Sequence, residues 1–168
     1  TFMIPWISPE NQEETLTKLS KTKTKAAFGH LELKGFAVYP GNVQHQGMDS
    51  SVLDKFRIVC SGHYHTRSND GKVFYLGNPY QLFWNDVDDK RGFSFFDTET
   101  FELEFIQNPY NIFERIYYED NKYQLFNAEP YKNKIVKIIV RKKSDQLQFE
   151  KFVDKIYKSG AIDIKIVE

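Results

Sequence analysis

Three of the four histidines in the chain stand where they could bind a metal ion. His63 and His65 form a His-x-His motif within Ser61-Gly62-His63-Tyr64-His65, and His30 ends the run Ala26-Ala27-Phe28-Gly29-His30. Imidazole nitrogen is a good ligand for Zn²⁺, Mn²⁺ and Fe²⁺. A His-x-His pair arises by chance in roughly one sequence in ten of this composition, so the motif alone is weak evidence.

The placement of these histidines strengthens the metal-site hypothesis. His30 and His63 each follow a glycine at the end of a short apolar run that is typical of a buried strand. Open α/β sheets place their binding sites at the carboxyl ends of such strands. Side chains two apart on an extended segment project to the same side, so we expect His63 and His65 to face one cluster while Tyr64 points elsewhere.

The alternative is that His30, His63 and His65 are hydrogen-bonded loop residues without a ligand role. We assign the fourth histidine, His45, to an ordinary surface loop because it lies in a polar, glycine-rich stretch.

Carboxylates suitable for a two-metal site are missing from the expected positions. Two-metal phosphate-ester hydrolysis needs bridging ligands between ions about 3.5–4 Å apart. The chain contains no Asp-x-His and no Asn-His pair, and Asp49, Asp54 and Asp70 do not fall at predicted strand ends. The histidines therefore predict one half of such a site.

The elements that must position these residues are typical of an α/β fold. We expect a strand over residues 2–7, then a helix with Ser8 as its N-cap, Pro9 in its first turn and a solvated, lysine-rich end. Short apolar runs at 26–30, 58–63 and 73–76 predict buried strands of one sheet, with a short helix capped by Asp49 or Ser50 between the first two. Residues 92–96 and 101–105 predict an antiparallel hairpin.

A second unit is expected from about Pro109. Strands are predicted over 112–118, 135–140 and 161–167, with a helix from about Gln146 to Ser159-Gly160 before the last strand. We therefore place a domain at 1–108 and a small α+β domain at 109–168.

Bulk properties exclude several classes of protein. Lys plus Arg and Asp plus Glu both number 23, so attraction to phosphates must come from local patches or bound metal ions. The single cysteine, Cys60, sits in an apolar run, which excludes a disulfide framework and favours a reducing, cytoplasmic compartment. The chain contains no stretch of about 18 apolar residues, which is the length needed to span a membrane. The chain begins without Met in a strand-like run, so we expect it to enter a fold partway through.

Four segments, in this order and spacing, resemble the second half of a calcineurin-like metallophosphoesterase: Gly29–Glu32, Ser61–His65, Tyr75–Gln81 and Lys90–Phe93. The Gly77-Asn78-Pro79 and Lys90-Arg91-Gly92-Phe93 segments are most similar to the SbcD-type nuclease subunit of recombination and break-repair complexes.

The resemblance implies a fold and a set of ligands. Residues 1–108 would be the second half of an αββα sandwich, and residues 109–168 a capping domain that helps to position DNA. The site would hold two divalent ions, Mn²⁺ or alternatively Mg²⁺. His30 and His63 would bind one ion, and His65 would bind the other. The implied partners are DNA, a coiled-coil ATPase of the structural-maintenance-of-chromosomes type and, for the full-length protein, a second copy of itself. The implied location is the cytoplasm, which is that of the bacterial host if the chain is phage-encoded.

The chain departs from that family in a major respect. It lacks the motifs that supply the Asp-x-His ligands, the bridging Asp and the Asn-His pair with its proton-donating histidine, so we assign no general acid to any residue. We expect no nuclease activity from these 168 residues alone, and the function would belong to a longer parent.

DNA contacts and the alternatives to nuclease function also follow from the sequence. The densest basic stretch ends in Arg141, Lys142 and Lys143, which could contact DNA phosphates or simply face solvent. The alternatives are an enzyme of the same fold acting on nucleotides or phosphoproteins, and a non-catalytic scaffold.

Overall fold

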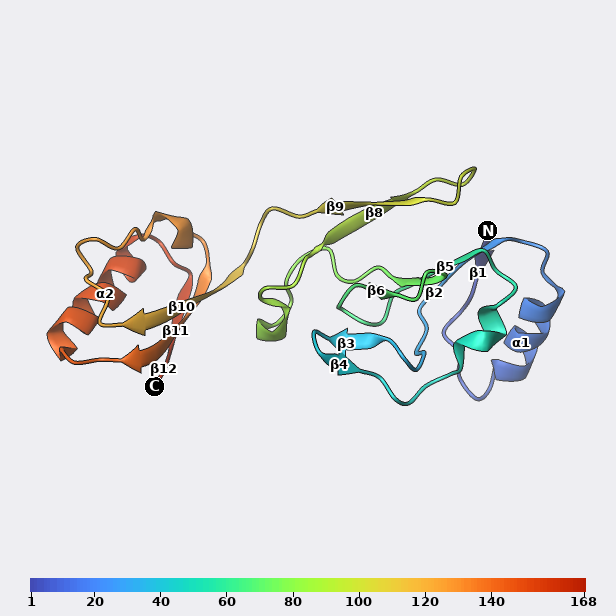
Figure 1. Ribbon diagram of the computed structural model, residues 1–168, viewed down its shortest axis with the longest axis horizontal. Coiled ribbons are helices and arrows are strands. Elements are labelled where there is room, and N and C mark those ends of the chain that lie inside the picture. Colours follow the sequence, from blue (N-terminus) through green and yellow to red (C-terminus); the bar gives the residue numbers. More distant parts are fainter. The chain divides into compact units, whose positions relative to one another are not determined.

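The computed structural model describes residues 1–168, which divide into two compact units, Thr1–Asn108 and Pro109–Glu168 (Figure 1). No helix in either unit is long and apolar enough to cross a membrane. The mixture of helices with parallel and antiparallel sheets confirms the α/β class expected from the sequence.

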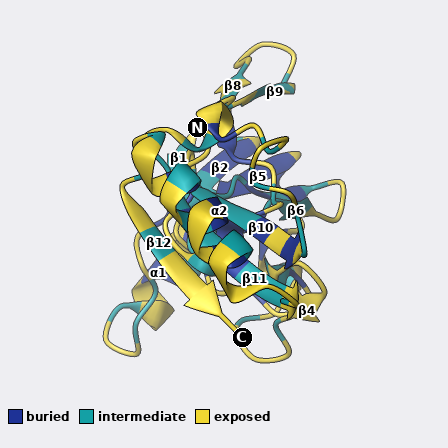
Figure 2. Ribbon diagram, turned by 90° about the vertical axis from the view of Figure 1, so that its left-hand side faces the viewer, coloured by how far each residue is buried: buried dark blue, intermediate teal, exposed yellow.

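Unit 1 is built on a five-stranded sheet in the order β1-β2-β5-β7-β6. Its strands are β1 (Phe2–Met3), β2 (Ala26–Gly29), β5 (Ile58–Ser61), β7 (Val73–Tyr75) and β6 (Ser68–Asn69). All neighbours pair in parallel except β6 and β7. The central strands are short and apolar because both of their faces are covered, as parallel sheets require, and Figure 2 shows β5 in the colour of buried residues.

One face of this sheet is covered by helices. Helix α1 (Gln12–Lys21) and the 3₁₀ helix η1 (Ser50–Leu53) bring Leu19 and Leu53 onto Ala27 and Val59, and all four side chains are buried. The expected cap of η1 is present, because the Asp49 carboxylate accepts a hydrogen bond from the Ser51 N–H at 2.9 Å.

The other face of the sheet packs against the predicted hairpin, β8 (Gly92–Phe96) and β9 (Leu103–Gln107), which pair antiparallel. Phe96, Phe101 and Leu103 pack on Ala26, Ile58 and Cys60. Cys60 is thus a buried core residue, as expected. Unit 1 therefore has a helical layer, a mostly parallel sheet and a second, two-stranded sheet.

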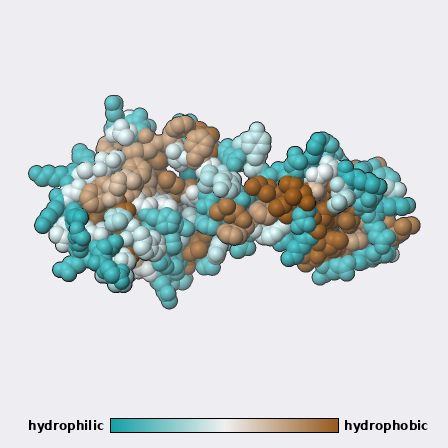
Figure 3. Space-filling view, turned by 180° about the vertical axis from the view of Figure 1, so that it is seen from behind, coloured by the Kyte–Doolittle hydropathy of each residue, from teal (hydrophilic) through white to brown (hydrophobic).

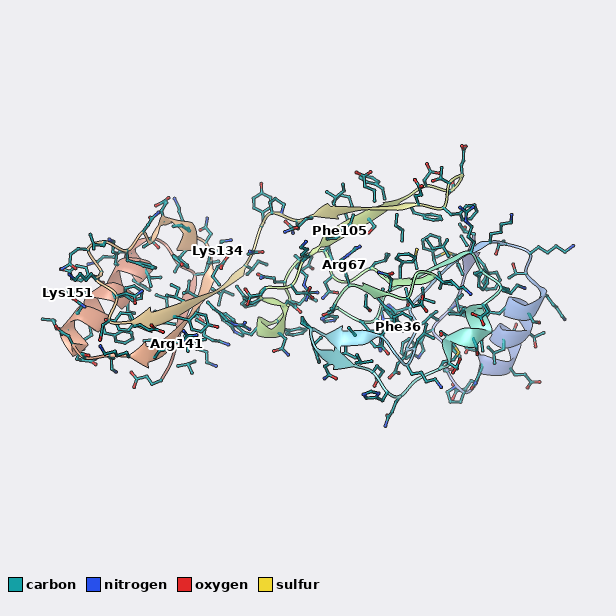
Figure 4. The ribbon with its side chains drawn as sticks, viewed as in Figure 1. Phe36, Arg67, Phe105, Lys134, Arg141 and Lys151 are labelled. Carbon is teal, nitrogen blue, oxygen red and sulfur yellow. The ribbon has the colours of Figure 1, made fainter.

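Arg67 joins the hairpin to the residues that follow the His-x-His motif. Its guanidinium lies 3.7 Å from the ring centroid of Phe105 and donates to the Ser94 hydroxyl at 3.2 Å (Figure 4). This cation–π contact and hydrogen bond tie the second sheet to the loop after β5.

Helix α1 begins later than expected. Its N-cap is Asn11 rather than Ser8, and it ends at Lys21, so the later lysines of the basic run lie outside it. The reason is local: the Asn11 side chain accepts from the Ser8 N–H at 2.9 Å and donates to the Trp6 carbonyl at 2.8 Å. Strand β1 is correspondingly short and leaves Pro5 to Ile7 in a loop.

The remaining elements of unit 1 are small. β3 (Ala37–Tyr39) and β4 (Asn42–Val43) form a separate antiparallel pair, and η2 (Trp84–Asp86) is a 3₁₀ turn between β7 and β8. His45, two residues after β4, is exposed on a loop, as predicted.

Unit 2 contains β10 (Phe113–Glu119), η3 (Glu129–Tyr131), β11 (Ile135–Lys142), α2 (Gln146–Lys158) and β12 (Asp163–Val167). Phe149, Phe152 and Ile156 of α2 pack on one face of the sheet, against residues such as Tyr118 and Ile138. The α+β description needs correction, because both strand pairings are parallel. Long connections between the strands permit crossovers, and α2 is the crossover from β11 to β12. Apolar side chains also reach the surface of both units, as brown patches in Figure 3.

Candidate metal centre

Parallel pairing of β2 with β5 brings His30 and His63 together. Gly29 and Ser61 are partners in the register, and the Gly62 N–H donates to the Gly29 carbonyl at 3.0 Å. The two imidazole rings lie 5.3 Å apart between centroids, at 80° to each other. Two imidazoles on one tetrahedral ion, with metal–nitrogen bonds of about 2.0–2.1 Å, would have centroids about 5 Å apart. The pair therefore fits two positions of a single ion's ligand shell.

The chain does not complete that shell. No group of three or more His, Cys, Asp or Glu side chains is arranged to hold an ion. The residues present thus fit a metal ion as a partial ligand set.

His63 owes its position to an unusual backbone. Its φ of +85° lies in the left-handed region, which side chains other than glycine adopt at a cost of about 1–3 kcal/mol and mostly at functional sites. The segment is therefore not the extended strand that was expected, although His65 lies close enough to His63 to lower its pKa. A Cβ on Gly62 would lie 2.8 Å from Nδ1 of His30, so a larger residue there would have to displace the His30 ring.

Buried hydroxyls fix the loop that carries His30. The Ser61 hydroxyl accepts from the Leu31 N–H at 2.9 Å, and the Tyr75 hydroxyl donates to the Leu31 carbonyl at 2.8 Å. Tyr64 is buried and its hydroxyl donates to the Leu33 carbonyl at 2.8 Å, while its ring lies 5.0 Å from that of His63, contrary to the expected separation. Burial raises the pKa of the Tyr75 hydroxyl, which therefore stays protonated as this hydrogen-bond donor.

His65 is held by different contacts. Its ring stacks on Phe83, with centroids 5.8 Å apart and planes 4° from parallel. Its backbone carbonyl accepts from the Asn78 N–H at 3.1 Å and from the Arg91 guanidinium. Asn78 belongs to the Gly77-Asn78-Pro79 segment that carries the resemblance, and it contacts His65 through its backbone.

A buried cluster of charged residues holds in place the two side chains that contact His65, which are Phe83 and Arg91. Arg91 pairs with Asp86 and with Asp89, each at 2.9 Å, and the Arg91 and Asp86 side chains are 3% and 2% exposed. The second oxygen of Asp86 accepts from the backbone N–H groups of Leu82 at 2.7 Å and Phe83 at 3.0 Å. Sequence reasoning missed this cluster, because it gave no role to Asp86 or Asp89 and used Arg91 only as part of the Lys90-Arg91-Gly92-Phe93 segment.

The electrostatic environment favours neutral imidazole at His63. Burial, and then the proximity of His30, lower its pKa, His65 adds to this effect and Glu32 opposes it. Neutral imidazole is the form that binds a metal ion.

Trp6 is a second residue that sequence reasoning missed. Its ring centroid lies 5.3 Å from that of His63 and 5.9 Å from that of His30. The sequence pattern places it in a short strand, so nothing in that pattern links it to the histidines.

In unit 2, each of the three candidate DNA contacts has an acidic partner. Arg141 pairs with Glu119 at 3.0 Å, Lys142 pairs with Asp120 at 2.9 Å, and Lys143 pairs with Glu168. Arg141 also lies over the Tyr117 ring, 4.0 Å from its centroid. These pairs partly neutralise the basic stretch.

The strand register forms another basic group instead. Arg115, Lys137 and Lys165 are direct partners across β10, β11 and β12. Burial, and then the two neighbouring cations, lower the pKa of Lys137. The group combines residues from three distant segments, so no local sequence signal could have revealed it.

Comparison with known proteins agrees with the residue pattern of unit 1. No family model matches the chain. It is 35% identical to "Exonuclease subunit 1" of Enterobacteria phage T4 over 165 residues, which cover 98% of this chain and 48% of that protein. The chain thus spans about half the length of the relative it matches. The sequence motifs independently suggested a resemblance to the recombination exonuclease subunit of T-even bacteriophages, and this match agrees with that resemblance. The chain is therefore similar, over nearly all of its own length, to about half of a phage exonuclease subunit.

Proposed function

We propose that this chain is part of a metal-dependent DNA nuclease subunit that hydrolyses phosphodiester bonds and acts in DNA recombination, replication and break repair. The observation that carries the proposal is the contact between His30 and His63, which stand at the ends of paired parallel strands. Similarity to an exonuclease subunit supports the same reaction class.

In this proposal the histidines supply nitrogen ligands for two divalent ions, Mn²⁺ or Mg²⁺. His30 and His63 hold one ion and His65 holds the other. When bound, such ions lower the pKa of a water molecule and neutralise charge on the leaving oxygen. The Ser61 and Tyr75 hydroxyls orient His30 through the backbone of Leu31, while Phe83 and Arg91 orient His65.

The chain on its own would be inactive, because its histidines do not complete either ligand shell and no carboxylate joins them. We propose that the other ligands come from another part of the full-length protein. Unit 1 would then be the second half of an αββα metallophosphoesterase sandwich and unit 2 a DNA-capping domain. The partners would be DNA, a coiled-coil ATPase and a second copy of the protein, in the cytoplasm of the bacterial host if the protein is phage-encoded.

Cleavage by the full-length protein tests the proposal. With Mn²⁺, His63→Gln should lower cleavage of linear duplex DNA by about 100-fold or more, since even residues that only orient metal ligands contribute about 10–100-fold. His45→Gln is the matched control, because His45 is exposed on a loop, and it should leave the rate unchanged.

Two results would favour other functions. Preferential cleavage of cyclic nucleotides or phosphopeptides would indicate a different enzyme with this fold. Absence of cleavage together with no stabilisation by Mn²⁺ would indicate a non-catalytic scaffold, since a ligand at about 100 times its Kd adds about 2.7 kcal/mol to the free energy of unfolding.

DNA contacts in unit 2 can be assigned by comparing two triple variants of the full-length protein. One neutralises Arg141, Lys142 and Lys143, and the other neutralises Arg115, Lys137 and Lys165. Each lost phosphate contact reduces the slope of log binding constant against log salt concentration by about 0.9. An unchanged slope after neutralising a group excludes that group from DNA contact.

A further inference from the structure

A cavity of about 280 Å³ opens beside His30 in unit 1. Its lining includes Trp6, Gln12, His30, Glu32 and Met48. Ligand pockets in proteins usually have volumes of about 300–1,000 Å³, so this cavity is at the small end of the range. It suits one planar group better than a larger ligand.

Trp6 is the largest side chain of this cavity and does not serve the core. It is 49% exposed and belongs to none of the hydrophobic clusters. The loop that carries it is nevertheless fixed, because the Asn11 side chain bridges the Trp6 carbonyl and the Ser8 N–H. A half-exposed indole held against two imidazoles is a preformed stacking surface.

The other wall of the cavity supplies polar groups and a close backbone contact. The Gln12 amide can donate and accept hydrogen bonds, and the Glu32 carboxylate can accept them. The Met48 N–H donates to the Glu32 carbonyl at 2.9 Å. Gly47 has a φ of +110°, and a Cβ there would lie 2.7 Å from the same carbonyl, so glycine lets the two loops meet.

We propose that this cavity binds a nucleobase, which stacks on Trp6 beside His30. Every base has a flat π-face and hydrogen-bonding edges, and stacking on an aromatic side chain contributes about 1–3 kcal/mol per base. The inference rests on the proposed function: a phosphodiester held at the histidines would have its neighbouring base near Trp6, because the Trp6 ring centroid lies 5.3 Å from that of His63 and 5.9 Å from that of His30.

The test uses the 168-residue chain, without metal and with a chelator present. Trp6 and Trp84 are its two tryptophans, so Trp84→Phe leaves Trp6 as the sole indole fluorophore. Deoxyadenosine monophosphate should quench this fluorescence saturably, whereas deoxyribose 5-phosphate should not. Equal quenching by both compounds would overturn the proposal, because it would mean that the phosphate alone is bound.

A second measurement separates stacking from general binding. Trp6→Leu should weaken nucleotide binding by about 5- to 150-fold, the equivalent of the loss of one stacked base. Trp6→Phe should retain most of it. Broadening of the adenine proton resonances reports binding in both variants, and thermal unfolding checks that each variant folds. Unchanged broadening in Trp6→Leu would refute a role for Trp6.

These readouts are independent of catalysis. Failure of base binding in a protein that cleaves DNA would refute the nucleobase site alone. Base binding in a protein whose full-length form cleaves no DNA would support the site and refute the proposed nuclease function.

Discussion

Arg91→Met is the substitution that most directly tests how the His65 side of the site is built. The variant leaves Asp86 and Asp89 without the guanidinium that pairs with both at 2.9 Å. Breaking a buried ion pair by removing one partner costs about 3–5 kcal/mol, because a charge stays behind in a medium that solvates it poorly. Exposure of 3% for Arg91 and 2% for Asp86 places this pair in that class.

The matched control is an ion pair of similar geometry on the surface of the same unit. Lys34 and Asp49 lie 2.7 Å apart with side chains 50% and 52% exposed. Exposed pairs contribute about 0–1 kcal/mol, so Lys34→Met should cost no more than that. Burial, and not distance, therefore sets the expected difference between the two variants.

Urea unfolding followed by tryptophan fluorescence measures both effects. Trp6 and Trp84 both lie in unit 1, so the signal reports unit 1 without a contribution from unit 2. A loss below about 1 kcal/mol in Arg91→Met would refute the reasoning, because it would place the carboxylates in contact with water.

A rescue experiment separates charge from packing. Adding Asp86→Asn and Asp89→Asn to Arg91→Met removes the stranded charges and should recover about half or more of the loss. The amide oxygen introduced by Asp86→Asn can still accept from the Leu82 and Phe83 N–H groups, so the turn that presents Phe83 to His65 is retained. No recovery would mean that lost packing of the arginine stem dominates.

Three further predictions concern other parts of the molecule. Gly62→Ala should displace the His30 ring, since the new Cβ would lie 2.8 Å from Nδ1 of His30. The nuclease activity of the full-length protein should therefore fall by about 10–100-fold, while its thermal unfolding temperature changes little. Cys60 is buried with a pKa raised to about 11, so its reaction with a thiol reagent should stay slow up to about pH 9 and accelerate once urea unfolds unit 1. Lys165→Glu replaces a cation directly beside Lys137 and should stabilise unit 2 by about 0.2–1 kcal/mol, measured by thermal unfolding followed by circular dichroism. A destabilised variant would contradict repulsion between Lys137 and Lys165.

The histidine pair could be found from the sequence because its signals are local. A glycine followed by histidine closes each of two apolar runs, and parallel strands of similar length align their carboxyl ends. Strands β2, β5 and β7 of unit 1, the cap at Asp49 and the hairpin were predictable for the same reason, since alternation and turn residues act over a few positions. The short strands β3, β4 and β6 were not predicted. The start of α1 was not, because Ser8 and Asn11 are both good caps and the choice depends on the contact with the Trp6 carbonyl.

What the sequence could not reveal depends on contacts between distant residues. Arg91 acts on His65 from 26 positions away, and the pairing of Lys137 with Arg115 and Lys165 depends on strand register. In each case the residue types alone indicate a solvated charge, and only burial or register changes that interpretation. Arg91 and Arg141 make the contrast plain: both pair with a carboxylate at about 3 Å, but the first is enclosed and the second is 55% exposed. Because the energetic importance of such a pair follows from its surroundings, a basic residue in a sequence predicts a binding surface only after the fold has shown which charges it already satisfies.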